Sequence, residues 1–192
     1  MGAAYAIVRH APIGTSRRSA MGDTYEECLL LVTGETVSLN TFDKIFRSGY
    51  GPQWSDRPRS HTAHYSFHAL FPVPEAVQRR GFDAAGRLWC KEYWESSDDL
   101  LDMQVRRALG RRQYRFFVPE PLPKNFFRVV SHDYPSLAFQ LATLVRDGGS
   151  PFFEGRETLH QYLFQDGRYS GSQSPNRENA FSQIREEMGF LP

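Results

Sequence analysis

Apolar and polar residues follow regular periods along most of the chain. The run YEECLLLVTG, residues 25–34, is largely apolar and ends at a glycine, which indicates a strand. The next segment, residues 38–49, predicts a helix with Ser38 as N-cap and Gly49 as C-cap. Its apolar positions recur at helical spacing, at Leu39, Phe42, Ile45 and Phe46.

Residues 100–119 have the pattern of a β-hairpin that turns near residues 108–110. One face of the two strands is apolar and comprises Leu101, Met103, Val105, Tyr114, Phe116 and Val118. The opposite face is polar and comprises Asp102, Gln104, Arg106, Arg111, Gln113 and Arg115. The hairpin therefore has one face for the core and one for solvent or a partner.

The rest of the chain continues this alternation of elements. Residues 122–135 predict a helix, and residues 136–149 predict a strand. Residues 157–169 predict another strand that ends in an Asp-Gly turn, residues 170–180 a linker, and residues 181–190 a last short helix. Converging stripes predict one shared core at Phe116, Phe126, Val130, Leu137, Phe139 and Leu141.

The order strand, helix, insertion, hairpin, helix, strand predicts an α+β fold. We expect a ferredoxin-like βαββαβ plait, an antiparallel sheet with helices on one face, extended by edge strands. This domain covers residues 24–169 and includes an aromatic insertion at residues 72–100. Residues 1–23 are expected to form a basic N-terminal arm, and residues 170–192 a linker with the short helix.

The stretch SHTAHYSFHALFPVP, residues 60–74, carries three of the six histidines. Its alternating aromatic residues predict a half-buried strand with Tyr65, Phe67 and Phe71 inward. A helix would instead place His61, His64 and His68 on one face, which suits a metal. In the strand reading the last two lie about 13 Å apart, too far to share one ion. We therefore expect no metal.

Composition is that of an ordinary soluble protein, with a net charge of +1 and 40% hydrophobic residues. The basic residues comprise twenty Arg and three Lys, a skew that favours bidentate contacts but also follows from coding bias. Cys28 and Cys90 do not form a CxxC pair, so a reducing, cytoplasmic setting is expected. The apolar run at residues 3–8 is too short for a signal peptide core or a membrane span.

No catalytic or cofactor motif emerges from the sequence. Ser131, His132 and Asp133 are adjacent, and neighbours on a helix point to different faces. The chain has no GxSxG elbow, P-loop or GxGxxG, so we expect a non-enzymatic protein without a cofactor. Asp98, Asp99 and Asp102 lack EF-hand spacing and predict a solvated acidic turn.

Two clusters are candidates for binding a partner. Arg106, Arg111 and Arg115 share the polar face of the hairpin, where guanidinium groups can grip carboxylates or phosphates. A second cluster lies in the insertion, at Trp89, Tyr93 and Trp94. Large aromatic residues there either anchor a protein interface or cap the end of the sheet, and the sequence leaves both readings open.

Three segments carry a resemblance to a known family: FHALFPVPEAV, GFDAAGRLWCKEYWES and RRQYRFFVPEPLPKNFFRVVSHDYPSLAFQL. Over residues 65–167 the chain resembles the YubB-like family of plasmids and phages, which has a ferredoxin-like C-terminal domain. It departs at residues 95–98, Glu-Ser-Ser-Asp where the family has Gly-Thr-Lys-Trp, and at VPEPLP in place of a TAWSPP-like segment.

The resemblance implies an accessory protein of a mobile element, with no catalytic residues to carry over. It implies that the protein binds a host protein, for example to inhibit a host defence system such as CRISPR. The alternative is a small nucleic-acid-binding module that uses the arginine hairpin.

Overall fold

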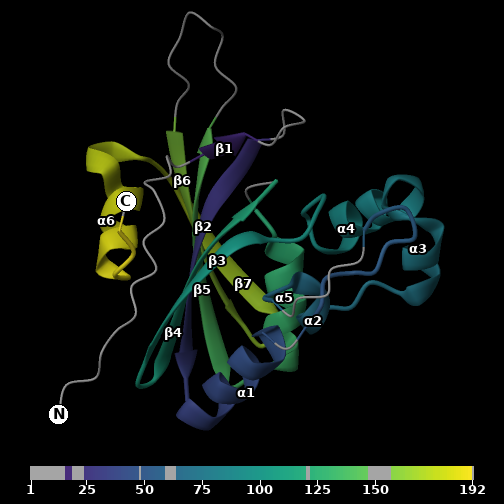
Figure 1. Cartoon of the computed structure of the whole chain (residues 1–192). Helices are drawn as coiled ribbons and strands as arrows, with labels where there is room; N and C mark the ends of the chain where they lie inside the picture. The colour runs from purple at the N-terminus through teal and green to yellow at the C-terminus, as the bar shows by residue number, and fades with distance from the viewer. Residues whose placement is uncertain are drawn as a thin grey trace, which may run out of the picture.

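A computed structural model describes residues 16–18, 24–47, 49–58, 64–119, 122–146 and 157–191. Its centre is one antiparallel sheet in the order β3-β4-β2-β5-β6-β7, with the short β1 paired to the start of β2 (Figure 1). The strands are β1 Ser16–Arg18, β2 Thr24–Gly34, β3 Leu101–Ala108, β4 Arg111–Val118, β5 Leu137–Arg146, β6 Glu157–Gln165 and β7 Arg168–Pro175.

Helices cover the two faces of the sheet unequally. Those before α6 are α1 Thr36–Arg47, α2 Phe67–Leu70, α3 Glu75–Arg80, the π-helical turn η1 Phe82–Gly86, α4 Arg87–Tyr93 and α5 Lys124–Asp133. The chain then adds η2 Arg177–Asn179 and α6 Ala180–Glu187. Figure 1 shows α6 alone on one side of the sheet and α1 to α5 on the other. No helix in the described residues is long and apolar enough to cross a membrane.

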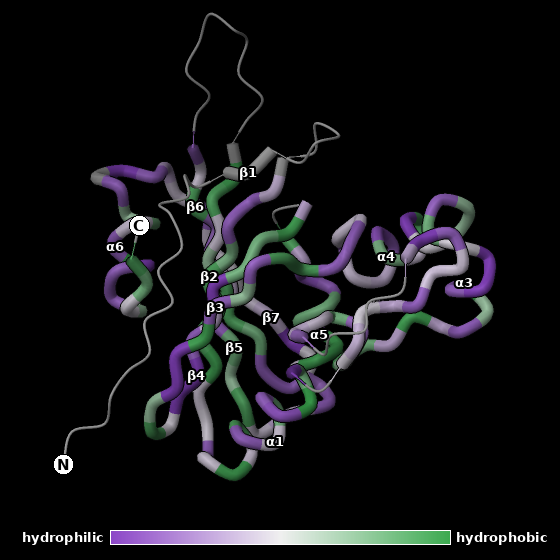
Figure 2. The backbone as a smooth tube through the Cα atoms, in the orientation of Figure 1, coloured by the Kyte–Doolittle hydropathy of each residue, from purple (hydrophilic) through white to green (hydrophobic). Residues whose placement is uncertain are grey.

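The face toward α1 to α5 holds the main core, which is built largely from aromatic rings. Phe42 of α1 lies edge-on to Phe139 of β5 at 5.4 Å between ring centroids. Phe67 of α2 lies 4.1 Å from Phe126 of α5. The six residues predicted to share one core all lie in this cluster, which confirms that prediction. Figure 2 shows the apolar β5 at the centre and the polar α3 at the periphery.

The α+β class and the antiparallel sheet are confirmed, but a four-stranded ferredoxin-like plait is not. The sheet continues through β6 and β7 beyond the four strands that such a plait contains. The helix of the predicted C-terminal extension, α6, packs on the face opposite to α1–α5. There Phe181 of α6 and Leu159 of β6 belong to a second, smaller core.

The strand predicted within residues 60–74 is wrong, because Phe67–Leu70 forms α2. Ser66 is its N-cap and accepts a hydrogen bond from the backbone N–H of His68 at 3.1 Å. Asp99, distant in the sequence, accepts from the N–H of Phe67 at 2.8 Å, so a tertiary contact overrides the alternating pattern. Phe67 is buried as predicted, whereas Tyr65 and Phe71 are only partly buried. His61 lies outside the described residues.

The linker predicted for residues 170–180 is also wrong over its first half, which belongs to β7. Asp166 and Gly167 have φ values of 48° and 71°, as in the tight turns that join antiparallel strands. The return strand pairs with β6 from Arg168 to Pro175. Of the N-terminal arm, the structure describes only β1, and the rest lies outside the described residues.

Candidate partner interface on the arginine hairpin

The β3–β4 hairpin presents its arginines on both faces of the sheet. Arg106 lies opposite Gln113, and Gln104 lies opposite Arg115. Since side chains alternate along a strand, Arg106, Arg111 and Arg115 share the face toward α6, as predicted. Arg107 and Arg112 point to the face that holds the main core.

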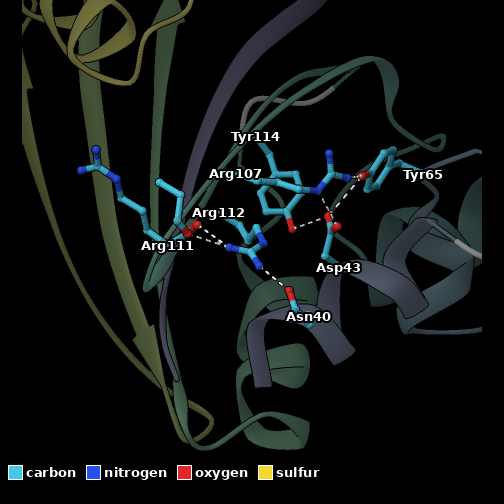
Figure 3. Close-up of polar contacts among 8 residues, drawn as sticks. Asn40, Asp43, Tyr65, Arg107, Arg111, Arg112 and Tyr114 are labelled. Carbon is cyan, nitrogen blue, oxygen red and sulfur yellow. Dashed lines mark hydrogen bonds and ion pairs between the residues drawn. The ribbon is translucent and has the colours of Figure 1, made fainter. Parts of the chain in front are cut away.

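Arg107 belongs to a polar network that ties the hairpin to α1 (Figure 3). Its Nε donates to Asp43 at 2.8 Å, and its Nη2 donates to the hydroxyl of Tyr65 at 2.7 Å. The hydroxyls of Tyr65 and Tyr114 both donate to Asp43, at 3.1 and 3.0 Å. Burial and the charge of Asp43 raise the pKa of Tyr65 to about 12 and that of Tyr114 further still. Both phenols stay protonated near neutral pH, so this network braces the fold.

Arg112 also connects the hairpin to α1. Its Nη1 donates to the carbonyls of Ala108 and Arg111, each at 2.8 Å, and its Nη2 donates to Asn40 of α1. The residue is buried. These contacts fix the hairpin turn against the first helix, and they leave Arg112 unable to reach a partner.

Arg115 is buried beneath α6, so the prediction that it stays at the surface is wrong. Its Nε donates to Glu27 at 2.6 Å, and Nη1 of Arg185 donates to the other carboxylate oxygen at 3.3 Å. Glu27, Arg115 and Arg185 are 1%, 4% and 5% exposed, and we call them the buried ion triad. Two cations share one anion here, and Nη2 of Arg115 and Nε of Arg185 have no hydrogen-bond partner among the described residues.

Arg106 and Arg111 remain available on the same face. Both side chains are exposed, and neither forms an ion pair in the described part of the chain. Figure 3 shows Arg111 extending away from the Asp43 network. The guanidinium of Arg106 lies 5.7 Å from the ring of Phe190, beyond the end of α6. These two residues form the candidate interface.

The aromatic residues of the insertion pack mainly against the end of the core. Trp94 is fully buried, and its Nε1 donates to the carbonyl of Phe71 at 3.1 Å. Trp89 stacks on Tyr93 at 4.8 Å, and Tyr93 keeps a partly exposed ring. The capping role explains these contacts, and Trp94 cannot anchor a partner without unfolding the insertion.

Asp99 departs from the predicted solvated turn. It accepts hydrogen bonds from the N–H groups of Phe67 and Leu100, at 2.8 and 2.9 Å, and from the hydroxyl of Ser66. Burial raises its pKa to about 6 despite these donors. Its neighbour Asp98 pairs with Arg57 at 3.1 Å. Asp99 is thus a structural cap for α2.

The three adjacent residues of α5 do not form a catalytic triad. Ser131 is buried, and its hydroxyl donates to the carbonyl of Arg128 and accepts from the N–H of Gly167. His132 is exposed, and its Nδ1 lies 3.4 Å from Asp133. His68 Nδ1 accepts from the N–H of Val73 at 2.9 Å. Among the residues that the structure describes, no three His, Cys, Asp or Glu are placed to hold a metal.

The sequence reading missed Glu27 and Arg185. The sequence does contain a signal for the burial of Glu27, because this residue shares a strand face with Leu29 and Leu31. A charged residue on an apolar face needs a buried partner, and the predicted α6 was the segment that supplied it.

Comparison with known proteins adds no relative. No family model, no curated protein and no solved structure matched this chain.

Proposed function

We propose that this protein is a non-enzymatic accessory protein that binds a host protein through the sheet face that carries Arg106 and Arg111. One observation supports this most strongly: of the five hairpin arginines, Arg107, Arg112 and Arg115 are held by internal hydrogen bonds. Arg106 and Arg111 are exposed on one face and form no ion pair among the described residues. An unpaired guanidinium costs little to keep in water and offers bidentate contacts to a carboxylate.

The same face favours a protein over a nucleic acid as the partner. Single-stranded RNA and DNA are held largely by aromatic side chains that stack on bases. Phe117, Phe181 and Phe190 on this side are buried under or within the α6 layer. Tyr25 is partly buried and lies at the opposite end of β2 from Thr33, which pairs with Arg111. Arg106 and Arg111 therefore have no exposed stacking platform beside them in the described residues.

The finer parts of the proposal rest on the sequence. Strands β5-β2-β4-β3, with α1 and α5, follow the order of a ferredoxin-like plait, and we propose that β6, β7 and α6 extend such a core. The resemblance to the YubB-like family supports a place on a plasmid or phage and a cytoplasmic setting. It also supports a host defence component, such as a CRISPR system, as the partner class.

The test is affinity capture from host-cell lysate with wild type and with an Arg106→Ala/Arg111→Ala variant. The matched control is Arg79→Ala/Arg80→Ala, which removes two exposed arginines from α3, far from the hairpin (Figure 1). We expect a protein captured by wild type and by the control, resistant to nuclease, and lost from the hairpin variant. Equal capture by both variants would contradict the proposal.

Nucleic-acid binding is the alternative, and the exposed arginine pair also supports it. In that case capture is sensitive to nuclease and the affinity falls steeply with salt. Removing two phosphate contacts should then lower the slope of log affinity against log salt by about two.

A further inference from the structure

The sheet face toward α6 is covered only in part. Strand pairing places Arg106, Gln113, Leu31, Gln140, Leu163 and Ser170 side by side in one row across β3, β4, β2, β5, β6 and β7. The adjacent row contains Gln104, Arg115, Leu29, Ala142, Gln161 and Ser172. In the second row α6 buries Arg115, Leu29 and Ala142, whereas the first row stays open over β5, β6 and β7.

A groove of about 600 Å³ lies beside α6 on this open part. Leu31, Gln140 and Leu163 form its floor, and Ile184 of α6 and Met188 at its C-cap form one wall. Leu163 is 41% exposed, although it lies within a strand that is paired on both sides. The groove therefore offers apolar side chains bordered by amide and hydroxyl groups.

The dimensions of the open part match one helix. Strands β5, β6 and β7 span two strand spacings, about 10 Å, which is close to the diameter of an α-helix with its side chains. The neighbouring α6 already packs on this face through Phe181, Ile184 and Met188, at spacings of three and four residues. A second helix beside α6 would use the same kind of contact.

The charges around the groove indicate what such a helix carries. Arg111 on β4 and Arg168 on β7 lie on this face at one end of the strands, and neither pairs with an acid among the described residues. Glu187 lines the wall that α6 provides. A docked helix would therefore carry acidic side chains at the end near Arg111 and Arg168, and a basic side chain beside Glu187.

We propose that an amphipathic helix of the partner protein docks in this groove, with apolar residues on Leu31 and Leu163 and acidic residues toward Arg111 and Arg168. This inference rests on the proposed function, since it names the partner segment that the same sheet face binds.

The probe is a synthetic amphipathic peptide of about 16 residues, or about 24 Å of helix. Its leucines recur at positions i, i+3, i+4 and i+7. Its glutamates occupy the terminal turn that would lie toward Arg111 and Arg168, and one lysine is placed to face Glu187. A control peptide of equal composition interchanges the glutamate and lysine positions. We expect the first peptide to bind with a Kd below about 1 mM and at least about tenfold more tightly than the control.

The protein variant for this test is Leu163→Lys, a change at an exposed side chain that should leave folding intact. We expect it to weaken the peptide about tenfold or more, whereas Leu88→Lys on α4, also exposed, should leave the Kd unchanged. Equal binding of the two peptides, binding by neither, or unaltered binding to the Leu163→Lys protein would overturn the inference. A wild-type dimer in sedimentation velocity that becomes a monomer in the Leu163→Lys variant would also overturn the inference. The groove would then be occupied by a second copy of this chain.

The two proposals fail separately. If the partner is lost from Arg106→Ala/Arg111→Ala but kept by Leu163→Lys, the proposed function stands and the helix inference falls. If the designed peptide binds as expected while lysate capture shows no dependence on the hairpin arginines, the groove is a helix site and the proposed function falls.

Discussion

The two faces of the sheet are built on different principles. Toward α1 to α5, aromatic rings fill much of the interface, and a polar network around Asp43 ties the hairpin to α1. Toward α6, a short helix covers a carboxylate shared by two guanidinium groups, and a groove remains open beside it. The first face carries the main aromatic core, and the second face leaves exposed the groups that we propose as the binding site.

The same contrast appears between the buried carboxylate of Glu27 and the half-buried carboxylate of Asp99. Glu27, under α6, contacts two arginines. Asp99, which caps the start of α2, accepts hydrogen bonds only from neutral donors in the described part of the chain. Neutralising each side chain should therefore change stability in opposite directions near neutral pH.

The largest effect is expected from the aromatic face. Phe139→Ala should lower the free energy of unfolding by about 3–5 kcal/mol, because the ring is fully buried against Phe42 and leaves a cavity. A reversible urea titration measures this. A loss below about 1 kcal/mol would mean that the face is less tightly packed than the structure indicates.

Glu27→Gln should destabilise the protein by about 3 kcal/mol, since it leaves two buried guanidinium groups without an anion. Hydrogen exchange should accelerate most across residues 180–190, because Arg185 fixes α6 to the sheet. The control is Glu186→Gln, an exposed position on the same helix. Unchanged exchange in α6 would show that the triad does not hold it.

Asp99→Asn should remove a pH dependence. The folded pKa of about 6 lies above the usual value of 3.8, so this group's contribution to stability is complete below about pH 4 and is lost as the pH rises through 6. Asparagine keeps an acceptor for Phe67 and Leu100 and gains a donor for Ser66. The variant should exceed wild type by about 2 kcal/mol at pH 8 and not at pH 4.

Urea titrations at the two pH values test this difference, with Asp83→Asn as an exposed carboxylate control. A variant less stable than wild type at pH 8 would contradict the contrast with Glu27.

We expect the smallest change in the free energy of unfolding for substitutions in the candidate interface. Arg106→Ala/Arg111→Ala should alter the free energy of unfolding by less than about 0.5 kcal/mol, because neither side chain forms an ion pair among the described residues. A loss above about 1 kcal/mol would assign these arginines a structural role.

Much of the sheet could be predicted from local pattern. β2, the β3–β4 hairpin, β5 within the described residues, β6 and the helices α1, α5 and α6 follow from periodicity and from turn residues. The helical elements of the insertion, α3, η1 and α4, and the short β1 were not predicted. Two further elements, α2 and β7, were missed for physical reasons. The start of α2 depends on Asp99, which is more than thirty residues away. The sequence of β7 has no alternating apolar positions, because β7 is an exposed edge strand whose backbone pairs with β6.

The site was predicted in part. Strand alternation correctly placed Arg106, Arg111 and Arg115 on one face. Sequence pattern alone could not reveal that α6 returns to that face and buries Arg115, nor that its placement leaves Leu163 open. Both depend on where a terminal helix docks, which local periodicity does not encode.

Site-specific photo-crosslinking tests the central claim most directly. A benzophenone side chain at Leu163, in the groove, is compared with one at Leu88, on α4 across the molecule, in cells that supply the partner. We predict a crosslinked partner peptide from position 163 and none from position 88. A partner that crosslinks from position 88, or equally from both, would contradict binding through the sheet face beside α6.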